Sequence, residues 1–164
     1  MKIHLKHPTD MHIKIICIGK LKKAYWQEAA EIYIQRLKKL YSLTLIELKD
    51  GPKHVHAEQR MQVEAQDIQG KASPQDQFIC LDSKGKTLSS PQLAARLQAW
   101  LSPPGRTPCF VLGGAYGLPK DLTAESAFVL SFGPMTLPHE LARIVLLEQL
   151  YRATTILNNH PYHH

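Results

Sequence analysis

The sequence predicts an α/β fold with a mostly parallel sheet that helices cover on both faces. Short apolar, β-branched runs alternate along the chain with longer segments of helical periodicity, which is the pattern of repeated βαβ units. The 164 residues suffice for one domain with a stable core, and no linker, internal repeat or low-complexity tract divides them.

The first half of the chain predicts two strand–helix pairs. Residues 13–18 are β-branched and stop at Gly19, as expected of a strand. Apolar side chains at helical spacing predict a helix over residues 24–40, and residues 43–48 alternate like a second strand. A more polar helix is expected over residues 54–70.

The second half repeats the alternation. Short apolar runs predict buried strands over residues 78–81 and 109–112, and the periodicity between them predicts a helix over 91–101. A last strand over residues 128–132 comes before a long final helix, residues 138–156. Each predicted strand is followed by a helix or by a glycine-rich turn, so the strands are expected to run parallel.

Three segments follow predicted strands and therefore lie where parallel sheets bind ligands, at the carboxyl ends of the strands. They are residues 81–85, 113–117 and 131–138. Glycines in the second segment allow backbone amides to approach a ligand closely, although they also suit a tight turn without a ligand. In the third segment Pro138 is placed to begin a helix and Thr136 to cap it.

The final helix is apolar over a wide arc from Leu141 to Tyr151. Such a helix is buried on more than one side, either at the centre of a monomer or in a dimer interface. Arg152 interrupts this surface. Because Glu148 precedes it by four residues, Arg152 forms either a helix-surface ion pair or a phosphate contact.

The chain has a net charge of +6 and a pI near 9.3, which favours a polyanionic partner. One early stretch is rich in basic residues, contains only the acids Glu28 and Glu31, and is therefore predicted to form a basic surface. Its basic residues are Lys14, Lys20, Lys22, Lys23, Arg36, Lys38 and Lys39. No apolar run is long enough for a membrane span and no signal peptide is visible, so a cytoplasmic protein is expected.

Several chemistries lack a suitable motif. The glycine turn is neither a dinucleotide fingerprint nor a P-loop, and no Ser-His-Asp, paired-carboxylate or His-Glu-x-x-His pattern occurs. Cys17, Cys80 and Cys109 lie in strand-like runs and are expected to be buried, reduced thiols. The histidines of the tail, residues 158–164, are not expected to hold a metal, because metal ligands usually come from rigid elements.

Residues 110–163 contain four motifs: Phe-Val-Leu-Gly-Gly-Ala-Tyr-Gly-Leu, Thr-Leu-Pro-His-Glu-Leu-Ala-Arg, Glu-Gln-Leu-Tyr-Arg-Ala and Pro-Tyr-His. Together they closely resemble the RlmH family, whose members are pseudouridine-N3 methyltransferases of 23S rRNA. Ile18-Gly19-Lys20 and residues 81–86 also match, so the resemblance extends from Met11 onward. It predicts one SPOUT methyltransferase domain over residues 11–164. Residues 1–10 are an extension to which no role is assigned.

The resemblance implies a SPOUT fold with a C-terminal trefoil knot, a homodimer, and S-adenosylmethionine as cofactor. With the glycine turn added, the expected cofactor contacts are Leu81, Gly113, Gly114, Gly133, Pro134, Met135, Thr136, Leu137 and Pro138. No metal is expected. Alternatives are a SPOUT methyltransferase of tRNA and a non-enzymatic RNA-binding protein of ribosome assembly.

The resemblance also implies a catalytic mechanism based on alignment of the pseudouridine N3 with the methyl group. The N3 proton must leave, and the candidate bases are His163, His139 and Tyr162, in that order. Arg152 and Arg143 are candidates to offset charge on the base or to bind phosphate. The target base must be accessible, so 23S rRNA is expected to present it in a loop.

Overall fold

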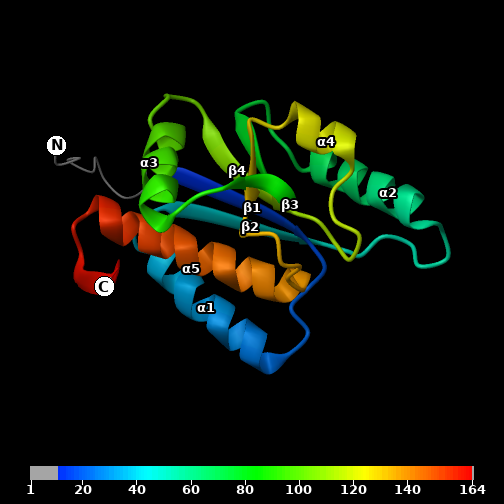
Figure 1. Ribbon diagram of the computed structural model, residues 1–164, viewed down its shortest axis with the longest axis horizontal. Coiled ribbons are helices and arrows are strands. Elements are labelled where there is room, and N and C mark those ends of the chain that lie inside the picture. The colour runs from blue at the N-terminus through cyan, green and yellow to red at the C-terminus, as the bar shows by residue number, and fades with distance from the viewer. Residues whose placement is uncertain (1–10, 164) are drawn as a thin grey trace.

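The computed structural model describes residues 11–163, which form a five-stranded, all-parallel sheet with helices on both faces (Figure 1). The strand order is β2-β1-β4-β3-β5. The strands are β1 (His12–Ile18), β2 (Ser42–Leu48), β3 (Asp76–Thr87), β4 (Thr107–Leu112) and β5 (Phe128–Ser131). The helices are α1 (Ala24–Lys38), α2 (Ala57–Gly70), α3 (Ser90–Leu101), α4 (Lys120–Glu125) and α5 (His139–Leu157). The predicted fold class is confirmed.

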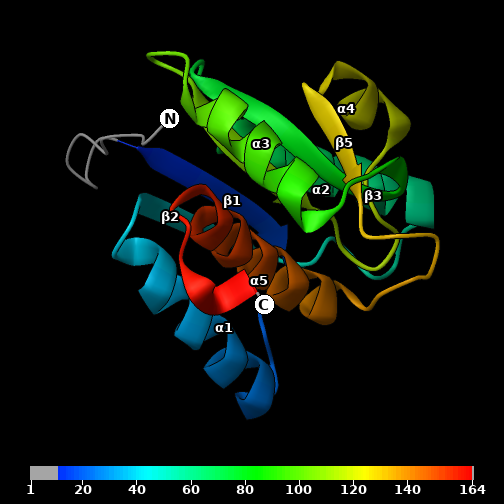
Figure 2. The ribbon, with the colours of Figure 1, turned by 60° about the vertical axis from the view of Figure 1, so that its left-hand side comes forward.

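Helices α1, α3 and α5 cover one face of the sheet, and α2 and α4 cover the other (Figures 1 and 2). Side chains of strand β1 pack against the helices on both faces of the sheet. Ile13, Ile15 and Cys17 join the core under α1, α3 and α5, whereas Ile16 and Ile18 join the core under α2. This burial on both faces explains why the strand is a continuous apolar run.

Helix α5 lies between α1 and α3, and most of its apolar arc is buried by contacts within the same chain (Figure 2). Leu146, Leu147, Leu150 and Ala153 are all fully buried. Of the two positions foreseen for this helix, the centre of a monomer accounts for most of its apolar surface. The width of the arc is therefore not in itself evidence for a dimer.

Three details differ from the sequence prediction. Helix α4 was not predicted, and β3 extends well beyond the four residues expected. Lys14, expected on a basic surface, is buried: its Nζ donates to Asp76 Oδ2 at 2.6 Å and to the Lys71 carbonyl at 2.7 Å. An alternating strand puts every second residue on the same face, and at this position a carboxylate compensates the buried ammonium.

Within the described part of the chain, no helix has the length and apolarity that crossing a membrane requires. Residues 1–10, for which an extension was predicted, lie outside the described residues, as does His164.

Candidate active site

A cavity of about 980 Å³ opens at the carboxyl end of the sheet, where β3, β4 and β5 end and α5 begins. This size is near the upper end of the roughly 300–1,000 Å³ that small-molecule sites occupy. All but one of the residues predicted to contact a cofactor line it: Leu81, Gly113, Gly114, Gly133, Met135, Thr136, Leu137 and Pro138. Pro134, also predicted, is exposed and is not part of the lining.

The glycine turn at the end of β4 folds tightly on itself. The Gly117 amide donates to the Gly114 carbonyl at 3.1 Å, and Gly117 has a positive φ of 79°. A Cβ atom on Gly113 would lie 2.6 Å from the carbonyl carbon and oxygen of Gly117. Glycine is therefore required at residue 113 because the backbone approaches itself there.

Gly114 is required for a different reason from the one that the sequence suggested. A Cβ atom there would lie 2.9 Å from Glu64 Oε2 and 3.0 Å from Ile18 Cγ2. Those atoms belong to the protein interior. The close approach that excludes a side chain at Gly114 is therefore to α2 and β1, beneath the turn.

Glu64 supports the turn from below, and sequence analysis missed it. Its side chain is 2% exposed, and Oε1 accepts from the Gly51 amide at 2.8 Å and from Arg60 Nε at 3.0 Å. Oε2 has no partner among the described residues. Arg60 in turn lies 5.6 Å from the ring centroid of Tyr116, on the turn itself. The available signal was the position of Glu64 on α2: it is next to the buried Ala65 and one helical turn, four residues, before the buried Ile68.

The loop between β5 and α5 is tied to an irregularity in β3. Leu81 and Lys86 both pair with Leu130, so the residues between them bulge out of the sheet. Ser131 Oγ donates to the Ser83 carbonyl in this bulge at 3.1 Å and accepts from the Gly133 amide at 3.0 Å. The loop and the bulge therefore form two sides of one cavity wall.

The first turn of α5 forms the rim of the cavity. Pro138, expected to be the first residue of the helix, is instead its N-cap, and α5 begins at His139. No side-chain hydrogen bond caps the helix, so Thr136 does not have the capping role expected of it. His139 lines the cavity, and its Nε2 would lie 3.3 Å from a Cβ atom on Gly19. The His139 side chain therefore lies between the cavity and Gly19, at the end of β1.

Arg143 does not offer a charge to a ligand. It is 1% exposed, and it donates from Nη1 to Glu47 Oε2 and from Nη2 to the Gly19 carbonyl, both at 2.6 Å. The expectation that Arg143 binds phosphate or the target base is wrong. Its helical position faces the sheet, and Arg143 instead fixes α5 to the ends of β1 and β2.

The other predicted catalytic residues lie elsewhere on α5. Arg152 forms the ion pair with Glu148 that the i,i+4 spacing suggested, with Nη2 2.7 Å from Glu148 Oε1. The chain ends in a 3-10 turn, Pro161–His163, and the Tyr162 hydroxyl donates to Glu148 Oε1 at 3.3 Å. His163 belongs to this turn. Arg152 and Tyr162 are thus brought together, with the ring 5.0 Å from the guanidinium.

Tyr162 is a poor candidate for a base. Burial, followed by a hydrogen bond with Tyr33 and the nearby charge of Glu148, raises the pKa of its phenol to about 12. At neutral pH the hydroxyl keeps its proton and acts as a donor. The ring stacks edge-on against Tyr151, with 4.8 Å between centroids.

The tail and the cavity of one chain lie far apart. His139 begins α5 and Arg152 comes thirteen residues later, so at 1.5 Å per residue roughly 20 Å of helix separates them. Neither Arg152 nor Tyr162 lines the cavity. Of the predicted catalytic residues whose side chains the structure describes, His139 is the one that borders the predicted cofactor contacts.

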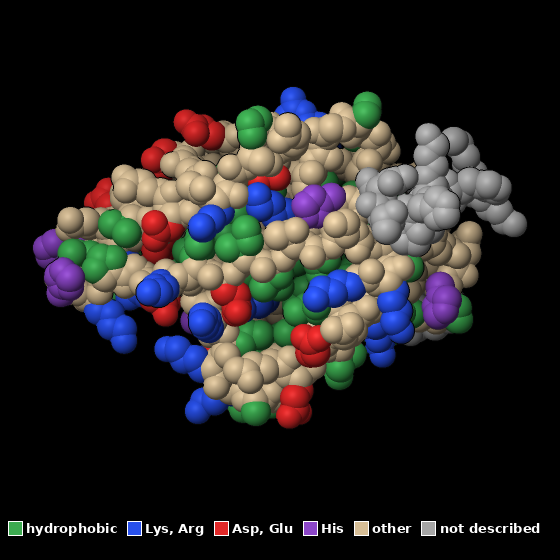
Figure 3. All heavy atoms as spheres, turned by 180° about the vertical axis from the view of Figure 1, so that it is seen from behind, with side chains coloured by type: hydrophobic (Ala, Val, Ile, Leu, Met, Phe, Trp, Pro, Cys, Tyr) green, Lys and Arg blue, Asp and Glu red, His purple; other side chains and the backbone are tan. Residues whose placement is uncertain are grey.

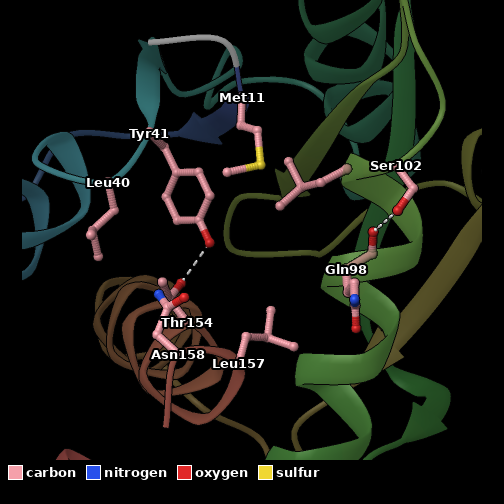
Figure 4. A pocket seen from close by; sticks show the side chains of 9 residues that line it. Met11, Leu40, Tyr41, Gln98, Ser102, Thr154, Leu157 and Asn158 are labelled. Carbon is pink, nitrogen blue, oxygen red and sulfur yellow. Dashed lines mark hydrogen bonds between the residues drawn. The ribbon is translucent and has the colours of Figure 1, made fainter. Parts of the chain in front are cut away.

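A second, smaller cavity lies at the opposite end of the sheet, among Met11, Tyr41, Leu157 and their neighbours (Figure 4). It measures about 160 Å³ and is mainly apolar, and its prominent polar contact is the 2.9 Å hydrogen bond between the Tyr41 and Thr154 hydroxyls. It contains none of the predicted site residues. Among residues 11–163, no three His, Cys, Asp or Glu side chains are grouped as a metal site requires.

Comparison with known proteins places this geometry in context. A family model described as "Predicted SPOUT methyltransferase" matches residues 11–163. A protein of Desulfovibrio desulfuricans named ribosomal RNA large subunit methyltransferase H is 45% identical over 152 residues, which are 93% of this chain and 97% of that protein. Proteins of the same name from Maridesulfovibrio salexigens and Lawsonia intracellularis are 41% and 40% identical, over 93% and 95% of this chain and 97% and 99% of theirs.

Proposed function

The chain belongs to the SPOUT methyltransferase family, and we propose that it methylates N3 of a pseudouridine in 23S rRNA of the large ribosomal subunit. It is an S-adenosylmethionine-dependent methyltransferase. The observation that carries the proposal is the cavity at the carboxyl end of the sheet, because the cofactor contacts expected from the resemblance converge on it from three separate segments.

The residues of the cavity suit this cofactor. Its volume accommodates a nucleoside with an amino-acid chain, and the Gly113–Gly117 turn and the loop over 131–138 offer backbone amides and carbonyls for the adenine and ribose. Leu81, Leu137 and Phe132 provide apolar surface for the adenine ring. The side chain of Met135, 81% exposed at the rim, is available to cover a ligand.

The cofactor supplies a methyl group on a positively charged sulfur, which is already a good leaving group. The task left to the protein is to orient the target base and to exclude water. Ser131 contributes by fixing the loop to the bulge of β3, and Arg143 by fixing the start of α5. With Tyr162 protonated at neutral pH, His163 and His139 remain as acceptors for the N3 proton, and Tyr162 and Arg152 as contacts to the RNA.

The proposal includes a homodimer in which the tail of one subunit completes the site of the other. Its support is the long separation between the tail and the cavity along α5. A second support is α1, which exposes two large apolar side chains seven residues apart on one face: Tyr25 is 60% exposed and Ile32 is 53% exposed. Exposed apolar groups on one helical face are typical of an interface.

The RNA partner of the proposal suits the distribution of charge. Lys20, Lys22 and Lys23 are exposed between β1 and α1, and Lys84 and Lys120 stand at the cavity. In the view from behind, Lys and Arg side chains are spread along the length of the molecule, several of them at its lower left (Figure 3). Such a surface attracts the phosphates of RNA around the cavity.

We further propose the cytoplasm as the compartment, since the substrate is the ribosome and the three cysteines are free and buried.

The trefoil knot belongs to the same proposal. It agrees with a loop over residues 131–138 that lies against the β3 bulge before α5 begins.

Methylation of ribosomes from cells that lack the endogenous enzyme tests the function. Purified protein and S-adenosylmethionine are expected to add one methyl group to a pseudouridine of 23S rRNA, and mass spectrometry of nuclease digests locates it. Free tRNA serves as the competing substrate in a parallel reaction. Methylation of tRNA with unmodified ribosomes would contradict the proposed substrate, and cofactor binding without any methylation would favour a non-enzymatic role.

A further inference from the structure

Arg36 lies within a group of three tyrosine rings that come from three separate elements. Its guanidinium carbon is 5.8 Å from the ring centroid of Tyr33 on α1, 5.2 Å from Tyr151 on α5, and 5.8 Å from Tyr162 in the C-terminal turn. Among the described residues no ion pair includes Arg36. Its cationic face is therefore directed to the rings, which attract it electrostatically.

The C-terminal turn also contacts α5, and the phenol of Tyr162 forms a hydrogen bond with Tyr33 on α1. The Tyr162 ring packs on Tyr151 and Arg152, and its hydroxyl donates to Glu148. The His160 amide donates to the Thr155 carbonyl at 2.8 Å. Arg36 adds a second contact from α1, and its guanidinium faces rings from α1, α5 and the turn.

We propose that Arg36 is a positioning residue for methyl transfer: it fixes the C-terminal turn, and with it Tyr162 and His163, in the orientation that meets the RNA. The proposal rests on the role proposed above for the tail. Arg36 itself touches neither the cavity nor the cofactor contacts. Its planar group suits the task, since a guanidinium packs on several rings at once, whereas the compact ammonium of a lysine does not.

The short connection between α5 and the turn explains why a contact from α1 has this influence. The last residue of α5 is Leu157, so only a few residues connect the helix to the turn, and Asn159 among them adopts a positive φ of 53°. Contacts with α5 alone would leave the turn free to rotate about this short connection. Contacts from α1 limit this rotation, and among them Arg36 is the one that faces all three rings. This matters for any group that must align with a reacting base.

The test combines a direct view of the turn with kinetics. Protein labelled with 3-fluorotyrosine gives a fluorine resonance for Tyr162, assigned by its loss in Tyr162→Phe. In Arg36→Gln this resonance is expected to move to the position of a free tyrosine. Turnover of ribosomes at saturating substrate should fall by about tenfold or more, with unchanged affinity for S-adenosylmethionine and unchanged dimer mass. Arg106→Gln makes the same substitution at an exposed loop site and should behave like the wild type.

Arg36→Lys keeps the charge and provides the second variant should Arg36→Gln fail to fold. It is expected to release the turn in the same way, because the planar face is lost. A Tyr162 resonance that stays in place in both variants overturns the proposal. Release of the turn with full turnover shows instead that Arg36 fixes the turn but that the tail has no part in methylation, so this result rejects the proposed role of the tail.

Discussion

Gly113→Ala tests whether the shape of the glycine turn determines cofactor binding. The added Cβ atom would lie 2.6 Å from the Gly117 carbonyl carbon and oxygen, against the 3.4 Å at which ordinary contact begins. The turn must therefore open by about 0.8 Å, the difference between these distances. If two backbone hydrogen bonds to the ligand are lost, at about 0.5–1.5 kcal/mol each, affinity should fall by roughly 5- to 150-fold.

Calorimetric titration with S-adenosylmethionine measures this loss, and thermal unfolding reports whether the variant is folded. Gly70→Ala is the matched control, because a Cβ atom there meets nothing within 4 Å. As the last residue of α2, it should raise helix stability by about 0.5–1 kcal/mol and leave affinity unchanged. A folded Gly113→Ala protein that binds the cofactor within about twofold of the wild type would refute the reasoning.

Two other predictions follow from buried groups. Arg143→Met should lower the free energy of unfolding by about 3 kcal/mol, because it removes two charge-assisted hydrogen bonds and leaves Glu47 unpaired, and the melting temperature should fall by roughly 6–12 °C. An unchanged melting curve would mean that these bonds are not formed in solution. Burial raises the thiol pKa to about 12, about 11 and about 12 at Cys17, Cys80 and Cys109. The unfolded chain loses these protons near pH 9.0 and the folded chain keeps them, so stability should decline as pH rises above that value, and a thiol reagent at pH 8 should react only after denaturant is added. Rapid reaction of the folded protein would contradict this burial.

The sequence was sufficient for the elements that have a strong periodic signal. Every predicted strand and helix is present, because runs such as that of β1 are buried on both faces and leave no ambiguity of pattern. Helix α4 escaped prediction since its six residues contain little more than a single turn and bury only Leu122. The β3 bulge escaped because residues 82–85 are polar and carry no periodicity.

The sequence indicated which segments could form the candidate site, but not how their side chains are directed. The rule that ligands bind at the carboxyl ends of parallel strands led to the edge of the sheet where the cavity lies. What sequence could not supply was the direction of each side chain. Arg143 and Arg152 are both arginines on α5, yet one is buried against Glu47 and the other pairs with Glu148 on the opposite side of the helix from the sheet. The direction of such a side chain depends on contacts between segments that are distant in the sequence, as the contact between Arg36 and Tyr162 also shows.

Mixed dimers offer a decisive test of the shared site. One subunit carries Gly113→Ala and has a defective cavity, and the other lacks residues 161–164 and therefore the tail. At a cofactor concentration too low to fill the weakened cavity of Gly113→Ala, each homodimer should be nearly inactive. Random pairing at equal amounts makes about half of all dimers mixed, and each mixed dimer has one site with an intact cavity and an intact tail from the other subunit, so activity should recover to about a quarter of the wild type. If tail and cavity act within one chain, every site keeps one defect and mixing restores nothing. The roughly 20 Å of α5 between His139 and Arg152 favours the first outcome, because the turn stays anchored to Glu148 and Arg36 on its own subunit.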